Sequence, residues 1–287
     1  MNCEDMRSSL HSCAAPFPWA DYAEIHDPAL DDQPVRAFGC EYACRQDWSR
    51  WQRAFITVFG IVDLPSRIRA RAVLWALQRF SCDHILDVGT GTGVYALYIT
   101  RDAESRVLAL DIDQRRIASV SDISGQLGRI GLTTLCGDDG VLSSLPRAYF
   151  SVGLAVEVLQ YFPDLPRTLR DLHERLRPGG GLVVHIPVRK EFWPYERTLF
   201  DDATLPWLFI NAGFEPPEIH QTFGRVALAL GRVFSRCASR PAVLAIVYPL
   251  LLLGAALIPK FTNSGECRLV IARKPIPNSS TTPLLSE

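Results

Sequence analysis

The sequence lacks an excess of charge of either sign, paired cysteine motifs and low-complexity segments, and each absence excludes a class of protein. Its 287 residues include 30 basic and 31 acidic side chains, a formal net charge of −1. Proteins that bind phosphate backbones are usually clearly basic, so we expect no nucleic-acid partner. The eight cysteines show no C-x-x-C pair and no Cys/His zinc spacing, which predicts reduced thiols in a cytoplasmic protein and no metal site.

No apolar segment of signal-peptide type lies near the first residue, so we expect no signal peptide. Hydrophobic residues make up 48% of the chain, which excludes a disordered protein and supplies a core for one large domain or two small ones. Residues 1–80 predict a helical N-terminal cap, in which Trp48, Trp51, Phe55 and Phe59 share one helical face. Asp63 and Pro65 then mark a second helix start.

Between residues 83 and 186, short apolar runs alternate with helical patterns. This rhythm predicts βαβ units and a parallel sheet flanked by helices. The runs are 85–88, 107–110, 132–135, 152–156 and 182–186. The glycine-rich stretch 177–181 is expected to turn the chain into the fifth strand. A helix near 202–212, a strand near 214–222 and a last strand at 267–272 follow, and residues 276–287 read as a disordered tail.

The segment 85–93 reads ILDVGTGTG, an apolar strand that enters three alternating glycines. Dinucleotide-binding loops follow G-x-G-x-x-G, whereas here the third glycine comes one residue early, at Gly93. A carboxylate such as Asp87 beside the loop repels a diphosphate and attracts a sulfonium group. We therefore expect the backbone amides of residues 89–93, with the nearby acid, to hold an aminoacyl nucleoside.

In these features the chain resembles the class I S-adenosylmethionine-dependent methyltransferases, over about 83–222 and the last strand. The resemblance rests on five segments in order, namely DVGTGTG at 87–93, LDID at 110–113, GDD at 137–139, VEVL at 156–159 and LRPGG at 176–180. It implies a Rossmann-like, doubly wound α/β sheet of seven strands, the last antiparallel. The methyltransferase domain would cover 81–275, with an apolar helical insertion at about 223–264.

The resemblance also implies S-adenosyl-L-methionine as cofactor and a set of residues that bind it. Asp111 would bind the ribose hydroxyls and Asp138 would lie near the adenine amino group, although both could instead serve a helix cap or a turn. Asp113 is assigned to the helix cap. The full implied set is Asp87, Gly89, Thr90, Gly91, Gly93, Asp111, Ile112, Asp138, Asp139 and Glu157.

No catalytic base is assigned from the sequence, and the two candidates are Tyr161 and His185. Many relatives carry a histidine near the position of Tyr161 and this chain does not, so Tyr161 could simply stack on cofactor or substrate. His185, at the end of the fifth strand, could accept a proton from a hydroxyl or could be a structural histidine. Trp193 and Tyr195 could wall the substrate or cover the core.

No acidic residue lies between Glu218 and Glu266. Arginines at 225, 232, 236 and 240 share one helical face, a composition typical of a helix at a membrane interface. Residues 242–259 are uncharged and almost wholly apolar. A single membrane crossing would separate two strands of one sheet, so three interpretations remain: a buried lid, an apolar substrate tunnel, or a hairpin that dips into a bilayer surface.

The sequence thus predicts transfer of a sulfonium methyl group to an O, N or C atom of a small or lipid-like acceptor. It leaves open a membrane contact through residues 225–260, which would make the protein cytoplasmic but peripheral to the membrane. Two alternatives remain, an NAD(P)-dependent oxidoreductase and a non-catalytic partner subunit that binds S-adenosylmethionine.

Overall fold

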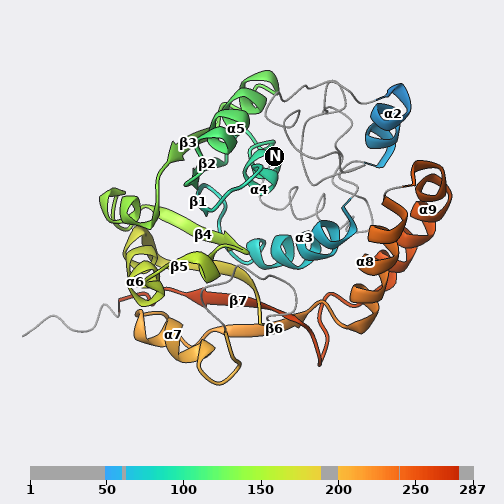
Figure 1. The fold of residues 1–287 in the computed structure, drawn as a ribbon. Helices are drawn as coiled ribbons and strands as arrows, with labels where there is room; N and C mark the ends of the chain where they lie inside the picture. Colours follow the sequence, from blue (N-terminus) through green and yellow to red (C-terminus); the bar gives the residue numbers. More distant parts are fainter. Residues whose placement is uncertain (1–48, 60–62, 189–199, 239, 278–287) are drawn as a thin grey trace, which may run out of the picture.

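The computed structural model describes residues 49–59, 63–188, 200–238 and 240–277. Within them seven strands form one sheet, in which six strands are parallel and β7 is antiparallel to both its neighbours. This confirms the predicted Rossmann-like α/β fold (Figure 1). In spatial order the strands are β3 (Leu132–Cys136), β2 (Arg106–Asp111), β1 (His84–Val88), β4 (Phe150–Val156), β5 (Leu176–Pro187), β7 (Cys267–Arg273) and β6 (Glu218–Thr222).

Helices cover both faces of the sheet because its strands are apolar on both sides. On one face the core is closed by α3 (Leu64–Leu77) and α4 (Val94–Ile99). On the other it is closed by α6 (Leu165–Arg175) and α7 (Leu205–Asn211). Helix α5 (Gln114–Gln126) contacts β2 and β3. Two short 3-10 helices, η3 (Asp139–Ser144) and η4 (Leu159–Tyr161), follow β3 and β4 in the chain.

The insertion before the last strand folds as two helices, α8 (Arg225–Ala238) and α9 (Pro241–Leu257). With α2 (Arg50–Phe59) and the start of α3 they enclose a separate apolar cluster centred on Tyr248, which is fully buried. Because α3 contacts both the sheet and this helical pair, it lies between them (Figure 1). Within the described ranges no helix is long and apolar enough to cross a membrane.

Helix α3 begins as predicted. The Asp63 carboxylate accepts a hydrogen bond from the backbone amide of Ser66 at 2.9 Å, and Pro65 lies in the first turn. This is the N-cap arrangement that an aspartate followed by a proline favours. Of the aromatic face predicted for the preceding helix, α2, Trp48 lies outside the described residues.

Two boundaries differ from those predicted. Strand β5 begins at Leu176, because the glycine-rich stretch does not leave the sheet: Leu176 pairs with Phe150, and Gly181 resumes the pairing with Val152 after a register shift. Strand β6 begins at Glu218, later than predicted, since Pro216 and Pro217 have no amide hydrogens for the ladder. The predicted substrate-wall residues Trp193 and Tyr195, and the tail beyond residue 277, lie outside the described residues.

Candidate active site

Parallel strands direct their carboxyl ends to the same edge of the sheet, and ligands bind in α/β sheets where the strand order reverses. Here the order reverses between β1 and β4. The glycine loop follows β1 and Glu157 follows β4, so both flank the reversal point. Asp111 ends β2, and Asp138 and Asp139 follow β3, on the same edge. The structure therefore brings the implied cofactor-binding residues to one edge.

The three glycines of the loop all have positive φ, +69° at Gly89, +59° at Gly91 and +75° at Gly93. L-residues with a side chain rarely adopt this region. A Cβ on Gly89 would lie 2.3 Å from Val158 Cγ2, and one on Gly93 would lie 2.8 Å from Val120 Cγ2. A Cβ on Gly91 would meet nothing nearer than the side chain of Arg116, at 3.5 Å. Two glycines are thus required for packing, whereas Gly91 leaves open space in front of the loop.

The loop amides are largely used within the protein, so the expectation that they face a ligand is wrong for four of them. The loop folds against the end of β2, whose oxygen atoms accept three of the bonds. These bonds run from the Gly89 and Thr90 amides to the Leu110 carbonyl (2.7 and 3.0 Å), from the Gly91 amide to Asp111 Oδ2 (2.8 Å) and from the Gly93 amide to the Thr90 carbonyl (3.0 Å). Helix α4 has only 6 residues, so its dipole adds little positive potential.

Asp87 organises the loop from beneath. Its side chain is almost fully buried and accepts a hydrogen bond from Thr90 Oγ1 at 2.7 Å. Burial raises the pKa of Asp87 to about 7; the Thr90 bond acts downward and the charge of Asp111 acts upward. The carboxylate is therefore only partly ionised near neutral pH, so Asp87 attracts a cationic ligand less than its sequence position suggests.

Asp111 does not cap the following helix. Its Oδ2 accepts the Gly91 amide and its Oδ1 accepts the Asp113 amide at 2.9 Å. The cap of α5 is Asp113, as predicted, since its Oδ1 accepts the amide of Arg115 at 2.9 Å. Asp111 is only half-buried, and its neighbour Ile112 is exposed. An apolar side chain beside a carboxylate suits one face of a nucleoside.

The two acids after β3 differ in their surroundings. Asp139 accepts a hydrogen bond at 3.0 Å from the hydroxyl of Thr168, a buried residue of α6. Asp138 is exposed. The one hydrogen bond that its side chain accepts from the described residues comes from the Gly140 amide in the same turn, at 3.0 Å. Asp138 is therefore the better placed of the pair to meet a ligand, and the turn role predicted for such an aspartate holds as well.

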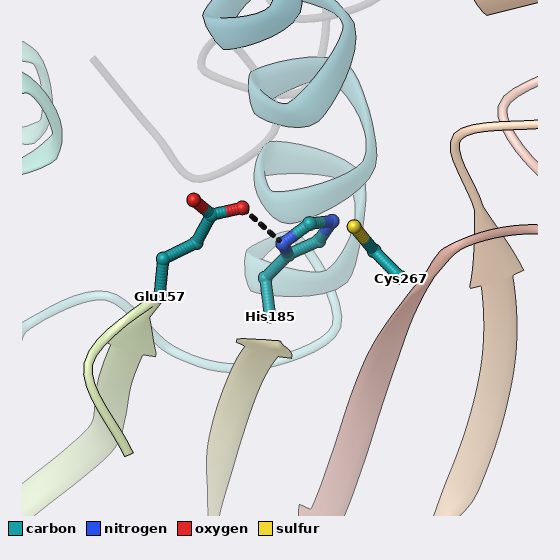
Figure 2. Close-up of side chains that lie close together, drawn as sticks. All are labelled: Glu157, His185 and Cys267. Carbon is teal, nitrogen blue, oxygen red and sulfur yellow. Dashed lines mark ion pairs between the residues drawn. The ribbon is translucent and has the colours of Figure 1, made fainter. Parts of the chain in front are cut away.

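Glu157 forms ion pairs with Arg69 and with His185, the second of which is drawn in Figure 2. Its φ is +55°, a strained conformation for a residue with a side chain. Its Oε2 lies 2.9 Å from a guanidinium nitrogen of Arg69 on α3, and its Oε1 lies 3.3 Å from His185 Nδ1. Burial acts to raise the pKa of Glu157, but Arg69 and His185 outweigh it and lower that pKa to about 2. Glu157 is thus a stable carboxylate whose charge is already compensated.

His185 is completely buried, with its Nε2 3.0 Å from Thr222 Oγ1. Burial lowers the pKa of His185, which favours the neutral imidazole. Such a side chain cannot touch an acceptor while this packing holds, so its environment is that of a structural histidine. Tyr161, in η4 beyond the end of β4, is exposed to solvent.

Glu157, His185 and Cys267 offer ligand-type atoms within 4.8 Å of one another. Figure 2 shows the imidazole between the other two side chains. The Arg69 guanidinium already neutralises the carboxylate, and burial raises the pKa of the Cys267 thiol. A protonated thiol and a paired carboxylate are poor metal ligands, so we assign this cluster a role in packing and charge compensation.

Arg69 and Phe223 were not among the site residues predicted from the sequence. Arg69 contacts Glu157 and also hydrogen-bonds Tyr95, the second residue of α4. Phe223 follows β6 with a φ of +58°, and its ring centroid lies 5.9 Å from that of His185. The sequence gives one sign of the role of Arg69, the alternation of arginines at 67, 69 and 71. Residues four apart share one side of a helix, so Arg67 and Arg71 lie together and Arg69 lies on another side.

Comparisons with known proteins agree with this geometry. Residues 86–184 match a protein family described as a methyltransferase domain. A probable S-adenosylmethionine-dependent methyltransferase of Mycolicibacterium smegmatis is 26% identical over 185 residues, which cover 60% of this chain and 68% of that protein. Two solved structures have the same fold at a TM-score of 0.52. One is an S-adenosylmethionine-dependent methyltransferase of Mesorhizobium loti (19% identical; 74% of this chain, all of that chain), and the other is the [4+2]-cyclase SpnF (21% identical; 86% and 89%).

Proposed function

The chain belongs to the class I S-adenosylmethionine-dependent methyltransferases, and from this premise we propose that it methylates a small or lipid-like acceptor, in peripheral contact with a membrane. One observation carries the proposal of methyl transfer. The segment that matches the methyltransferase domain family, 86–184, contains the glycine loop, Asp111 and Asp138, which lie at one edge of the sheet. The fold alone would not suffice, because the similar structure of SpnF belongs to a cyclase.

The residues present fit S-adenosylmethionine. Gly91 leaves space for a ligand against the loop, Asp111 offers carboxylate oxygens for vicinal hydroxyls, and Ile112 offers an apolar surface beside them. Asp138 is exposed in the segment that follows β3, at the same edge of the sheet. When bound, S-adenosylmethionine supplies an electrophilic methyl group on a positive sulfur. The work of the protein is then to orient the acceptor and to exclude water.

The described residues offer little for acid–base chemistry at this edge. His185 is buried and Glu157 is paired with Arg69, which leaves Tyr161 as the exposed candidate. We therefore propose that catalysis relies on positioning and that the acceptor is nucleophilic in its own right. The apolar helix α9 packs beside α8, which carries arginines and no acidic residue, and this combination supports an amphiphilic acceptor.

The test of this proposal separates binding from turnover. The purified protein is first titrated with S-adenosylhomocysteine and with NADH in a calorimeter, and we expect heat with the first ligand alone. It is then incubated with methyl-labelled S-adenosylmethionine and an extract of bacterial membrane lipids. Formation of S-adenosylhomocysteine with label in the lipid phase is expected. Binding without turnover on lipid and on water-soluble extracts would instead identify a non-catalytic subunit.

A further inference from the structure

We propose that α8 and α9 form a docking surface for a bilayer that contains anionic phospholipids, with both helices parallel to the membrane plane. The inference deepens the proposed function, and it rests on that function only for the link between docking and a lipid-like acceptor. Its evidence is an exposed apolar stripe, a row of basic residues beside it, and a helix that ties both to the active site.

The apolar stripe runs along the outer face of α9. It consists of Val243, Ile246, Leu250, Leu253 and Leu257, whose exposed fractions range from 41 to 76%. Their spacing of three and four residues places them on one side of the helix. The opposite side, with Leu244, Tyr248 and Leu251, is buried against α8, α3 and α2. A continuous exposed stripe of this kind marks an interaction surface.

The neighbouring helix supplies the charges. Arg225, Arg232 and Arg236 are exposed on α8, and Arg240 is exposed at the start of α9. No acidic residue occurs between Glu218 and Glu266. Two copies of this face would therefore oppose arginines to arginines without a counter-charge, whereas the phosphates of an anionic bilayer supply one. With 17 residues, α9 spans about 25 Å and would lie in the interface, not across it.

Helix α3 connects this surface to the active site through three arginines in alternation. Arg67 lies over the ring of Tyr248, 5.7 Å from its centroid, and Arg71 donates hydrogen bonds to the carbonyls of Ala255 and, at 3.3 Å, Ile258. Between them Arg69 reaches Glu157 at 2.9 Å. Docking of α9 therefore fixes the carboxyl edge of the sheet relative to the bilayer, which favours an acceptor drawn from the membrane.

The experiment is flotation of the full chain with vesicles of phosphatidylcholine alone or with phosphatidylglycerol. We expect binding to the anionic vesicles at low salt, at least about tenfold weaker binding to neutral vesicles, and release as salt rises. S-adenosylhomocysteine affinity is measured in parallel. A protein that binds the nucleoside and ignores anionic vesicles overturns the docking inference and the membrane contact, while leaving the methyl-transfer part of the proposed function intact.

Two pairs of variants locate the surface. Ile246→Glu with Leu253→Glu is compared with Ile130→Glu, whose native side chain is 95% exposed before β3. Arg232→Glu with Arg236→Glu is compared with Arg101→Glu and Arg170→Glu, which reverse exposed charges elsewhere. Each α8 or α9 variant should lose vesicle binding more than about tenfold, and each control should keep it, with nucleoside affinity unchanged in all four.

Equal loss in a control variant would overturn the proposal, because the effect would then be general. A second result would also overturn the proposal. If light scattering shows a dimer, and the Ile246 and Leu253 changes convert it to a monomer while vesicle binding persists, the stripe binds a second copy of the chain. Should the glutamate variants unfold, Leu250→Ser and the lipid and salt dependence of the unmodified chain decide the question.

Discussion

The carboxyl edge of the sheet has two unlike halves. Along β1, β2 and β3 the site is made of backbone and of residues close in sequence: a glycine loop, Asp111 and two further acids. Along β4, β5 and β6 it is made of side chains that come from distant segments, among them Arg69, Glu157 and His185. The first half faces open space at Gly91, whereas the second is closed by its own ion pairs.

This difference indicates which part of the chain binds the methyl donor common to the family and which part binds the acceptor of this enzyme. The match to the methyltransferase domain family covers 86–184, which includes nearly all of the first half and, of the second half, β4, Glu157 and most of β5. The helices α2, α3, α8 and α9, which flank the second half, lie outside it. We propose that the first half binds the methyl donor and that these helices adapt the enzyme to its acceptor.

The most damaging single change expected in the first half is Gly89→Ala. The new Cβ would collide with Val158 and hold a strained positive φ, so we expect a loss of about 2–4 kcal/mol in the free energy of unfolding and no measurable S-adenosylhomocysteine binding. Gly91→Ala meets no such collision and should cost only the strain, about 1–2 kcal/mol. Denaturant unfolding measures both, and a Gly89→Ala protein as stable as the unmodified one would contradict the packing argument.

Asp111→Asn is the next largest effect. The substitution removes the charge that accepts the Gly91 amide and that is proposed to bind the ribose, so S-adenosylhomocysteine affinity should fall about 10- to 100-fold, since hydrogen bonds to charged groups contribute about 1.5–3 kcal/mol. The matched control is Asp113→Asn, because asparagine caps a helix as well as aspartate does. Calorimetry with equal losses in the two variants would remove Asp111 from the binding site.

Glu157→Gln tests the second half. It leaves Arg69 without its counter-charge in a largely buried setting, so the free energy of unfolding should drop by about 2 kcal/mol at neutral pH, while nucleoside affinity changes little. The pKa of Glu157 is about 2, below its usual value of 4.5, so the stability it adds is present above about pH 4.5 and is lost as the pH falls toward 2. The two proteins should therefore converge in stability across that range.

Urea unfolding at a series of pH values measures the convergence. The difference in free energy of unfolding between Glu157→Gln and the unmodified chain could instead stay constant down to pH 2. That result would show that the stability does not come from the charge of the Glu157 carboxylate beside Arg69. Strong loss of S-adenosylhomocysteine binding in the same variant would erase the proposed division between the two halves.

The smallest effects are expected from the two acids after β3, and they should differ in kind. Asp139→Asn weakens the bond from Thr168 and should lower the free energy of unfolding by about 1 kcal/mol. Asp138→Asn should leave stability unchanged and reduce nucleoside affinity a few-fold. Calorimetry measures the nucleoside affinity of both variants, and thermal unfolding measures their stability. A loss of affinity in Asp139→Asn and not in Asp138→Asn would show that Asp139 is the ligand-binding acid.

The sequence was enough for the parts that depend on local patterns. The strands, the antiparallel last strand and the Asp63 and Asp113 caps follow from periodicity, capping residues and the family resemblance. The predicted start of β5 was wrong, because Leu176 pairs with Phe150 of β4 and hydrogen bonds to Lys274 hold Gly179 and Gly180 at the sheet. Local propensity gives no sign of such tertiary pairing.

Contacts between distant segments were not predictable in the same way. Arg69 and Glu157 stand 88 positions apart in the printed sequence, and no spacing rule relates them. The internal use of the loop amides was missed for a similar reason, since three of the four amides donate to oxygen atoms of the next strand.

The order of the strands has a consequence for how the chain matures. Among the described strands β6 pairs only with β7, and β7 also completes the edge of β5. During synthesis the sheet must therefore wait with an open edge until residues 267–273 have left the ribosome, and both helices of the insertion emerge before their anchor strand exists. A chain that stopped at residue 264 would lose two strands from the sheet, not one, and would expose β5 to pairing with other molecules.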